Sequence, residues 1–196
     1  LMNLLIKQIQ QTVENLVEAE KSESNYEFKI IKSTLNALLR KWHDYEYPHF
    51  VSEKANEQAK EIKINLWKQR WIQQPSFDKG RKLFVMEHKY PVSDMIKDMI
   101  ANPENIEMIF KSGEFGWILR LENKDLKRNN RGDHDAVYKK AGIRLLKPYS
   151  IIKAMRDSGN TSEQIAQYMN EQAIPTAQGG KWDGKIVLSA YEKRIY

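Results

Sequence analysis

The sequence contains no cysteine among its 196 residues. This absence excludes disulfide bonds, cysteine-ligated zinc, iron–sulfur clusters and catalytic thiols. Any metal site must therefore use histidine, aspartate, glutamate and asparagine. Such oxygen and nitrogen ligands favour a hard divalent ion, Mg²⁺ or Mn²⁺.

Long hydrophobic runs are also missing. No apolar run approaches the roughly 18 residues that a membrane span needs. The first residues, Leu1 to Gln8, lack the basic segment that precedes the apolar part of a secretory signal. We therefore expect a cytoplasmic protein with no membrane partner. Hydrophobic residues make up 41% of the chain, which is enough for a packed core.

Acidic residues are outnumbered, with 26 Asp and Glu against 32 Lys and Arg, a net charge of +6. Such a balance favours an anionic partner, with nucleic acid first. The excess is concentrated in residues 111–147, where ten Lys and Arg accompany five Asp and Glu, while residues 148–196 are only slightly basic. A solvated helix face would explain the basic stretch taken alone.

Residues 1–74 are predicted to form a helical region. Apolar residues recur at helical spacing in two segments, 3–19 and 28–42. A third helix is predicted from Ser52 to Ile72, because Pro75 prevents its continuation. Ile62 is expected on the core side of this helix.

Residues 75–147 form a second region with strand-like segments at 83–86 and 116–121. A helix between these segments is predicted to begin with Ser93 as its N-cap. A basic helix is predicted over 122–129.

Residues 148–196 are predicted to form three short helices. The first covers 150–157, and the second covers 163–172, preceded by a capping-box pattern that begins at Thr161. Asp183 is expected to cap the third. The expected fold class is therefore α+β, mainly α, with a helical N-terminal region, a small central core with a helical insert and a three-helix C-terminal unit.

Glu87 and His88 stand at the end of the first strand-like segment, just before a change of chain direction at Pro91. Hydrolysis of a phosphodiester by one metal ion needs a general base to activate water, oxygen or nitrogen ligands for the ion, and positive charge on the phosphates. All three residue types occur in this region. The alternative is a strand-end histidine that only hydrogen-bonds to a neighbour beside a solvated acid.

The segment Phe84–Val92, the strand Trp117–Arg120 and the helix start Glu122–Leu126 resemble the HNH, or ββα-metal, nuclease family. The resemblance implies that His88 is the general base and that Glu87 and Asn123 bind the metal ion. About 25 residues, including a helix, are inserted between the two strands.

The last histidine of the family motif has no unambiguous counterpart. The secondary candidates for this place are Asp125, Asn129 and His134. A turn in which an aspartate caps the helix 136–141 explains the sequence around His134 equally well. The aromatic stretch 42–50 also contains two histidines, but packing and helix capping account for such a stretch better than metal binding does.

The segment Ile165–Trp182 resembles the part that follows the catalytic domain in large serine recombinases, in which a helix leads to Gly-Ile-Pro-Thr, a Gly-Gly-x-Trp turn and another helix. Ala173 stands in place of the customary glycine. The resemblance implies a helix-turn-helix-like unit that binds DNA. The alternative is a three-helix unit that only packs on the rest of the protein.

The expected contacts with double-stranded DNA come from two parts of the chain. The candidates in the central region are Lys124, Lys127, Arg128 and Arg131. The candidates in the C-terminal unit are Gln178, Lys181, Lys185, Ser189, Lys193 and Arg194.

These patterns predict a metal-dependent, site-specific DNA endonuclease of restriction or mobile-element type, in which a homodimer would cut both strands. One alternative is a non-catalytic DNA-binding regulator or accessory protein of a mobile element. Another is a helical protein-interaction module, such as an immunity or antitoxin-like partner of an acidic protein.

Overall fold

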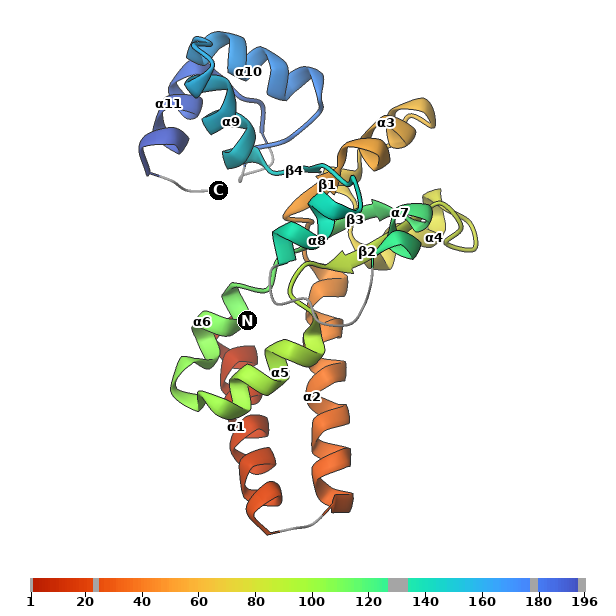
Figure 1. Cartoon of the computed structure of the whole chain (residues 1–196), viewed down its shortest axis with the longest axis vertical. Coiled ribbons are helices and arrows are strands. Elements are labelled where there is room, and N and C mark those ends of the chain that lie inside the picture. Colours follow the sequence, from red (N-terminus) through yellow and green to blue (C-terminus); the bar gives the residue numbers. More distant parts are fainter. Residues whose placement is uncertain (1, 23–24, 127–133, 177–179, 194–196) are drawn as a thin grey trace. The chain divides into compact units, whose positions relative to one another are not determined.

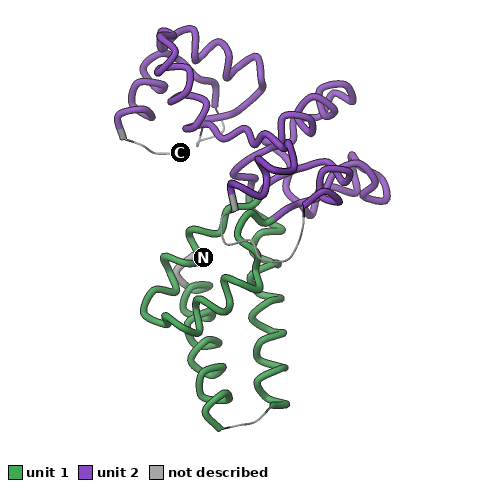
Figure 2. The backbone as a smooth tube through the Cα atoms, viewed as in Figure 1, with its two compact units in different colours: residues 1–46, 88–115 green, residues 47–87, 116–196 purple. Residues whose placement is uncertain are grey.

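The chain forms two compact units in a computed structural model that describes residues 2–22, 25–126, 134–176 and 180–193. One unit consists of residues 1–46 and 88–115, and the other of residues 47–87 and 116–196 (Figure 2). Both are rich in helix, and the second contains a small four-stranded sheet (Figure 1). The expected α+β, mainly α, class is therefore confirmed at this level.

The first unit is a helical bundle. Its α-helices are α1 (Met2–Lys21), α2 (Asn25–Tyr45), α5 (Val92–Ala101) and α6 (Ile106–Lys111), with a 3₁₀ turn η3 at Pro103–Asn105. The two long helices pack along each other, and α5 and α6 pack on them. The core contains the predicted apolar faces of α1 and α2, including Ile9, Val13, Leu35 and Leu39, none of which is exposed.

The helical insert contributes the other half of this core. Met95, Ile96 and Met99 of α5 pack with residues of α1 and α2 in one hydrophobic cluster. The units therefore cross the boundary expected at residues 74 and 75, because the insert shares its hydrophobic core with the N-terminal helices. Burial of apolar surface, which depends on contacts distant in sequence, decides this grouping.

The second unit contains the sheet. Its strands are β1 (Phe50–Ser52), β2 (Phe84–His88), β3 (Phe115–Leu119) and β4 (Leu145–Leu146), in the order β2-β3-β1-β4. Strand β1 runs parallel to β3 and antiparallel to β4. The Arg120 N–H donates to the Leu83 carbonyl and the Lys89 N–H to the Glu114 carbonyl, so β2 and β3 run antiparallel.

The central strand β3 is covered on both faces. Trp117 contacts the rings of Trp71 and Phe77, whose centroids lie 5.7 and 5.8 Å away. On the other face, Ile118 shares a buried cluster with Phe50 and Tyr138. This two-sided burial explains why the strand is almost continuously apolar rather than alternating.

Helices and turns surround the sheet. They are α3 (Glu53–Glu61), η1 (Leu66–Lys68), η2 (Trp71–Gln73), α4 (Gln74–Phe77), α7 (Arg120–Asp125) and α8 (His134–Lys140). The C-terminal helices are α9 (Pro148–Asp157), α10 (Ser162–Glu171) and α11 (Gly184–Lys193). None of the helices among these described residues is both long enough and apolar enough to cross a membrane.

Three predicted elements are wrong. The basic helix expected over 122–129 begins at Arg120 and ends at Asp125, and the backbone of Leu126 after it is extended. The third helix does not extend from Ser52 to Ile72, because α3 ends at Glu61 and Lys63 adopts a left-handed backbone with φ of 59°. Ile62 is accordingly 37% exposed and lies outside the core. Ser93 is not an N-cap either, because α5 begins one residue earlier, with Pro91 as the capping position.

Gly116 allows β1 and β3 to pair. A Cβ atom at this residue would overlap the carbonyl oxygen of Phe50, its register partner on β1. We expect Gly116→Ala to lower the free energy of unfolding by about 3 kcal/mol, because backbone must move to admit the methyl group. Chemical denaturation of the variant measures this loss.

Gly180→Ala is the matched control, since a Cβ there meets only the Thr176 hydroxyl at 3.4 Å, an ordinary contact. We expect it to change stability by less than about 1 kcal/mol. Equal stabilities for the two variants would contradict this account of the strand pairing.

Candidate nucleic-acid interface

The C-terminal helices α9, α10 and α11 form a three-helix unit in which each helix packs on the other two. Its buried residues include Ile152, Ile165, Met169, Ile174, Trp182 and Val187. All of these were expected in the core. Leu188 was also expected there, but it is 41% exposed, because it points away from α9 and α10 on the outer face of α11.

The helix starts follow the sequence signals. The Gln164 N–H donates to the Thr161 hydroxyl, and the Thr161 N–H donates to the Gln164 side chain, which completes the predicted capping box. The Asp183 carboxylate accepts the N–H of Ile186 at 2.8 Å, so the predicted cap of α11 is also present. Helices α10 and α11 therefore begin at the residues whose side chains accept their first N–H groups, Thr161 and Asp183.

The connection between α10 and α11 is held by Asn170. Its side-chain amide donates to the Trp182 carbonyl and its side-chain oxygen accepts the Trp182 N–H, both at 2.9 Å. The Trp182 indole N–H donates to the carbonyl of Ile174, also at 2.9 Å. This role of Asn170 was missed from the sequence, because its partner lies twelve residues away across an irregular connection.

Ala173 adopts the conformation that the customary glycine would adopt. Its φ is 57°, in the left-handed region. The Asn65 side chain donates to its carbonyl at 3.0 Å, and the Lys60 ammonium donates to the neighbouring Gln172 side chain at 2.7 Å. The substitution therefore keeps the helix-ending geometry, and contacts from α3 and the segment after it stabilise this turn.

The outer side of α11 and the segment before it carries exposed polar groups. Lys181 and Lys185 are exposed, and Ser189 is half-buried. Lys193 ends α11, and its side chain is not among those described; Gln178 and Arg194 lie outside the described residues. Leu188 of the same helix is exposed as well, so α11 presents both polar and apolar side chains to solvent.

A shallow groove of about 530 Å³ lies between α8 and the beginning of α9. Its walls include the side chains of Lys139, Arg144 and Lys147. Arg144 is paired with Glu53 at 2.8 Å. The lining also includes the acid Asp135, so the groove before the three-helix unit carries three cations and one carboxylate.

His88, the predicted general base, lies at the end of β2 and its ring faces another histidine. His88 Nε2 is 2.8 Å from Nδ1 of His43, which is buried on α2. Burial, and to a lesser extent the charge of Arg40, lowers the pKa of His88 to about 4. His88 is therefore neutral at pH 7, and one of its two ring nitrogens is engaged.

The two histidines of the stretch 42–50 lie in different units. His43 packs against Phe110 and Phe115, and its ring centroid lies 4.5 Å from that of Phe115. His49 is exposed in the other unit. The packing interpretation of this stretch fits these positions.

The predicted metal ligands Glu87 and Asn123 lie in the second unit. Glu87 is half-buried in β2, and Asn123 is half-buried in α7, where its side-chain oxygen is buried and has no hydrogen-bond partner among the described residues. Lys124 and Asp125 of the same helix are exposed. An orphaned amide oxygen fits a ligand, but no group of three or more His, Asp and Glu side chains in the described part of the chain is arranged to hold a metal ion.

Several predicted residues cannot be located. Lys127, Arg128, Asn129 and Arg131 lie outside the described residues, and His134 is placed only by its backbone, at the start of α8. The structure therefore describes Lys124 alone among the four cations expected to bind DNA in the central region.

Glu122 was not predicted, although it is the buried carboxylate of this region. It accepts the Ser52 hydroxyl at 2.6 Å and the Leu119 N–H at 2.8 Å. The only sequence signal was its place three residues after Leu119, at the start of a helix. Both hydrogen bonds use the same carboxylate oxygen, Oε2, and they join two chain segments, so Glu122 has a structural role.

A comparison of the chain with protein-family models, curated proteins and solved structures finds no match.

We expect Asn170→Ala to lower the free energy of unfolding of the three-helix unit by about 2 kcal/mol, because the Trp182 N–H and carbonyl both lose their partner. Hydrogen exchange of the amides in α10 and α11 measures this loss locally. Gln167→Ala is the matched control, since its amide only reaches Glu171 on the exposed face of the same helix. A loss of the same size in both variants would show that Asn170 has no special role.

Proposed function

We propose that the chain is a protein that binds double-stranded DNA through its C-terminal unit, with α11 in the major groove. The observation that carries the proposal is the orientation of α11. Val187 and Ala190 are buried against the other two helices, while Lys185 and Leu188 face outward. A third helix with an apolar inner face and a polar outer face is what a helix-turn-helix-like unit offers to DNA.

The positive groups around the unit support this proposal. Lys181 precedes α11, and Lys139 and Lys147 line the groove in front of α9. Lysines at such positions contact phosphates and contribute affinity without reading sequence. Ser189, on the half-buried flank of α11, is the candidate for contact with a base edge.

The purified chain should bind mixed-sequence duplex DNA with an affinity that falls steeply as salt increases. We expect Lys181→Ala/Lys185→Ala to weaken binding on all sequences and to reduce the slope of log K against log salt by about two, one for each lost phosphate contact. Fluorescence anisotropy over a KCl series measures the slope.

Lys97→Ala/Lys111→Ala is the control with the same change of net charge. These lysines lie in the other unit and pair with Asp94 and Glu107. If both double variants reduced the slope equally, the effect would be one of total charge, and the assignment of α11 to the DNA would fail.

A second candidate function is cleavage of the bound DNA. The observation that favours it is the order of elements: β2 ends in Glu87 and His88, β3 pairs antiparallel with β2, and α7 follows β3 directly. This is the strand–strand–helix order of the ββα-metal nucleases that the sequence resembles, with α5 and α6 inserted.

For this second function we expect the wild-type chain to nick plasmid DNA in Mg²⁺ or Mn²⁺, and both Glu87→Gln and His88→Ala to lose about 10²-fold or more of the rate. Glu87→Gln keeps the size of the side chain and therefore controls for misfolding of His88→Ala, which loses its partner His43. Unchanged cleavage by both variants would exclude these residues, and no cleavage by the wild type would leave DNA binding alone.

A further inference from the structure

The turn between α4 and β2 is built around one buried carboxylate. Asp78 is 3% exposed and accepts the backbone N–H groups of Lys82, Leu83 and Phe84 at distances of 2.9 to 3.2 Å. The Gln74 side chain donates to the same carboxylate at 2.9 Å and to the Phe84 carbonyl at 2.8 Å. Burial opposes ionisation of Asp78, yet these hydrogen bonds outweigh it and lower its pKa.

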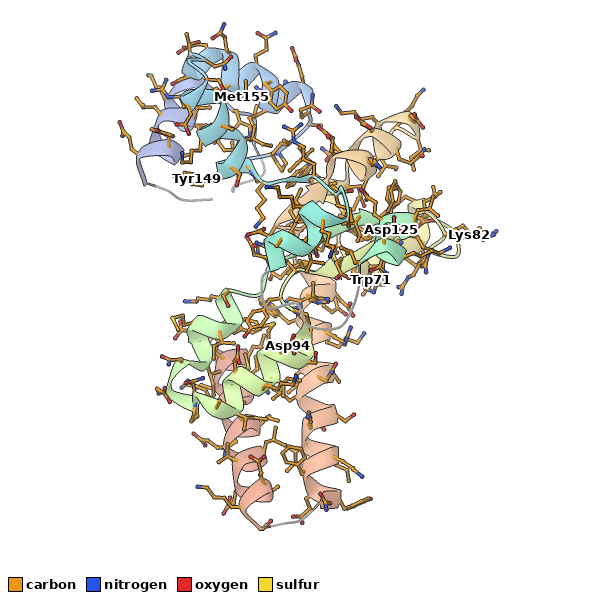
Figure 3. All side chains as sticks on the ribbon, viewed as in Figure 1. Trp71, Lys82, Asp94, Asp125, Tyr149 and Met155 are labelled. Carbon is orange, nitrogen blue, oxygen red and sulfur yellow. The ribbon has the colours of Figure 1, made fainter. Side chains whose placement is uncertain are left out.

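This anchoring directs three cationic side chains to the surface. Lys79 and Lys82 are exposed and Arg81 is half-buried. Figure 3 shows the Lys82 side chain projecting outward from the turn. Gly80 and Arg81 both have left-handed backbones, with φ of 76° and 53°, so the chain reverses sharply within the cationic stretch.

A fourth cation is fixed beside the turn. The Arg120 guanidinium, at the start of α7, donates through Nε and Nη2 to the Arg81 carbonyl. The Arg81 guanidinium itself lies over the indole ring of Trp71, 4.3 Å from its centroid. Two of the four cations are thus held in place by the protein before any partner arrives.

Acidic residues of the turn itself do not neutralise the cations of this surface. Asp78 is the only acid in residues 78–83, and its oxygens are occupied by backbone and amide donors in the interior. The neighbouring helix α7 adds Lys124 and Asp125, whose charges cancel. Four cations therefore lie around one turn, three of them exposed and Arg81 half-buried, in an arrangement that fits a row of phosphates.

We propose that the 78–83 turn, together with Arg120, is a second phosphate-binding surface that contacts the backbone of the double-stranded DNA bound by α9–α11. The inference rests on the proposed function and extends it, since none of these four cations belongs to the C-terminal unit. Preorganised guanidinium groups lose little entropy when they bind, and phosphate contacts of this kind fix the register of a protein on DNA.

The test is the salt dependence of duplex binding by the full chain carrying Lys79→Ala/Lys82→Ala. Lys82 supports the turn through its backbone N–H, which alanine retains, and both side chains are exposed, so we expect unchanged thermal unfolding. The slope of log K against log salt should fall by about two relative to wild type. The control Lys97→Ala/Lys111→Ala has the same net charge and should keep the wild-type slope.

Comparison with Lys181→Ala/Lys185→Ala separates this inference from the proposed function. If the α11 variant loses affinity and the turn variant keeps the wild-type slope, the turn does not bind DNA and only this inference fails. If the wild-type chain does not bind duplex DNA at low salt, both fail. If the turn variant loses binding to polyglutamate while keeping its DNA slope, the surface serves an acidic protein and the inference is overturned.

Discussion

The carboxylate of Glu122 joins the two chain segments on which the second unit depends. It accepts the Ser52 hydroxyl at the end of β1 and the Leu119 N–H at the end of β3. Ser52 in turn caps α3 by accepting the Ala55 N–H at 3.1 Å. One buried acid therefore fixes the point at which two paired strands lead into α3 and α7. Burying a carboxyl group is costly unless it is hydrogen-bonded, so removing either donor to Oε2 would weaken this junction.

The same device recurs at Asp78. There a buried carboxylate is satisfied by three backbone N–H groups and an amide, and the cations of the turn are left outside. In both places the carboxyl group is buried and hydrogen-bonded to groups of the protein. This distribution makes the surface of the second unit more positive than its composition suggests, because acids that would otherwise screen the cations are turned inward.

The sequence predicts the elements whose signals are local. The capping box at Thr161, the cap at Asp183 and the apolar faces of α1 and α2 depend on residues within one or two turns of each other, and the structure contains all of them. Strands β1 and β4 were missed because three and two residues carry no periodicity, and their pairing partners are distant along the chain.

The same distinction between local and long-range signals applies to the candidate site residues. The exposure of Lys185 follows from the helical pattern of α11, whereas the pairing of His88 with His43 joins residues 45 positions apart. The sequence shows an acid and a histidine at a strand end, but it cannot show that this imidazole is half-buried against another. Long-range burial also decides that the insert 88–115 belongs with the N-terminal helices.

The modest charge of the C-terminal unit bears on how the proposed binding would work. Residues 148–196 contain six Lys and Arg against five Asp and Glu, and Lys153 is engaged with Asp157 at 2.6 Å. Affinity for DNA depends largely on the number of phosphates neutralised. A DNA-reading unit with so little excess charge needs further phosphate contacts from cations elsewhere in the chain. The turn at 78–83 and Lys139 in the groove before α9 offer such cations, so in the proposed function α11 would supply the reading surface and the sheet region further phosphate contacts.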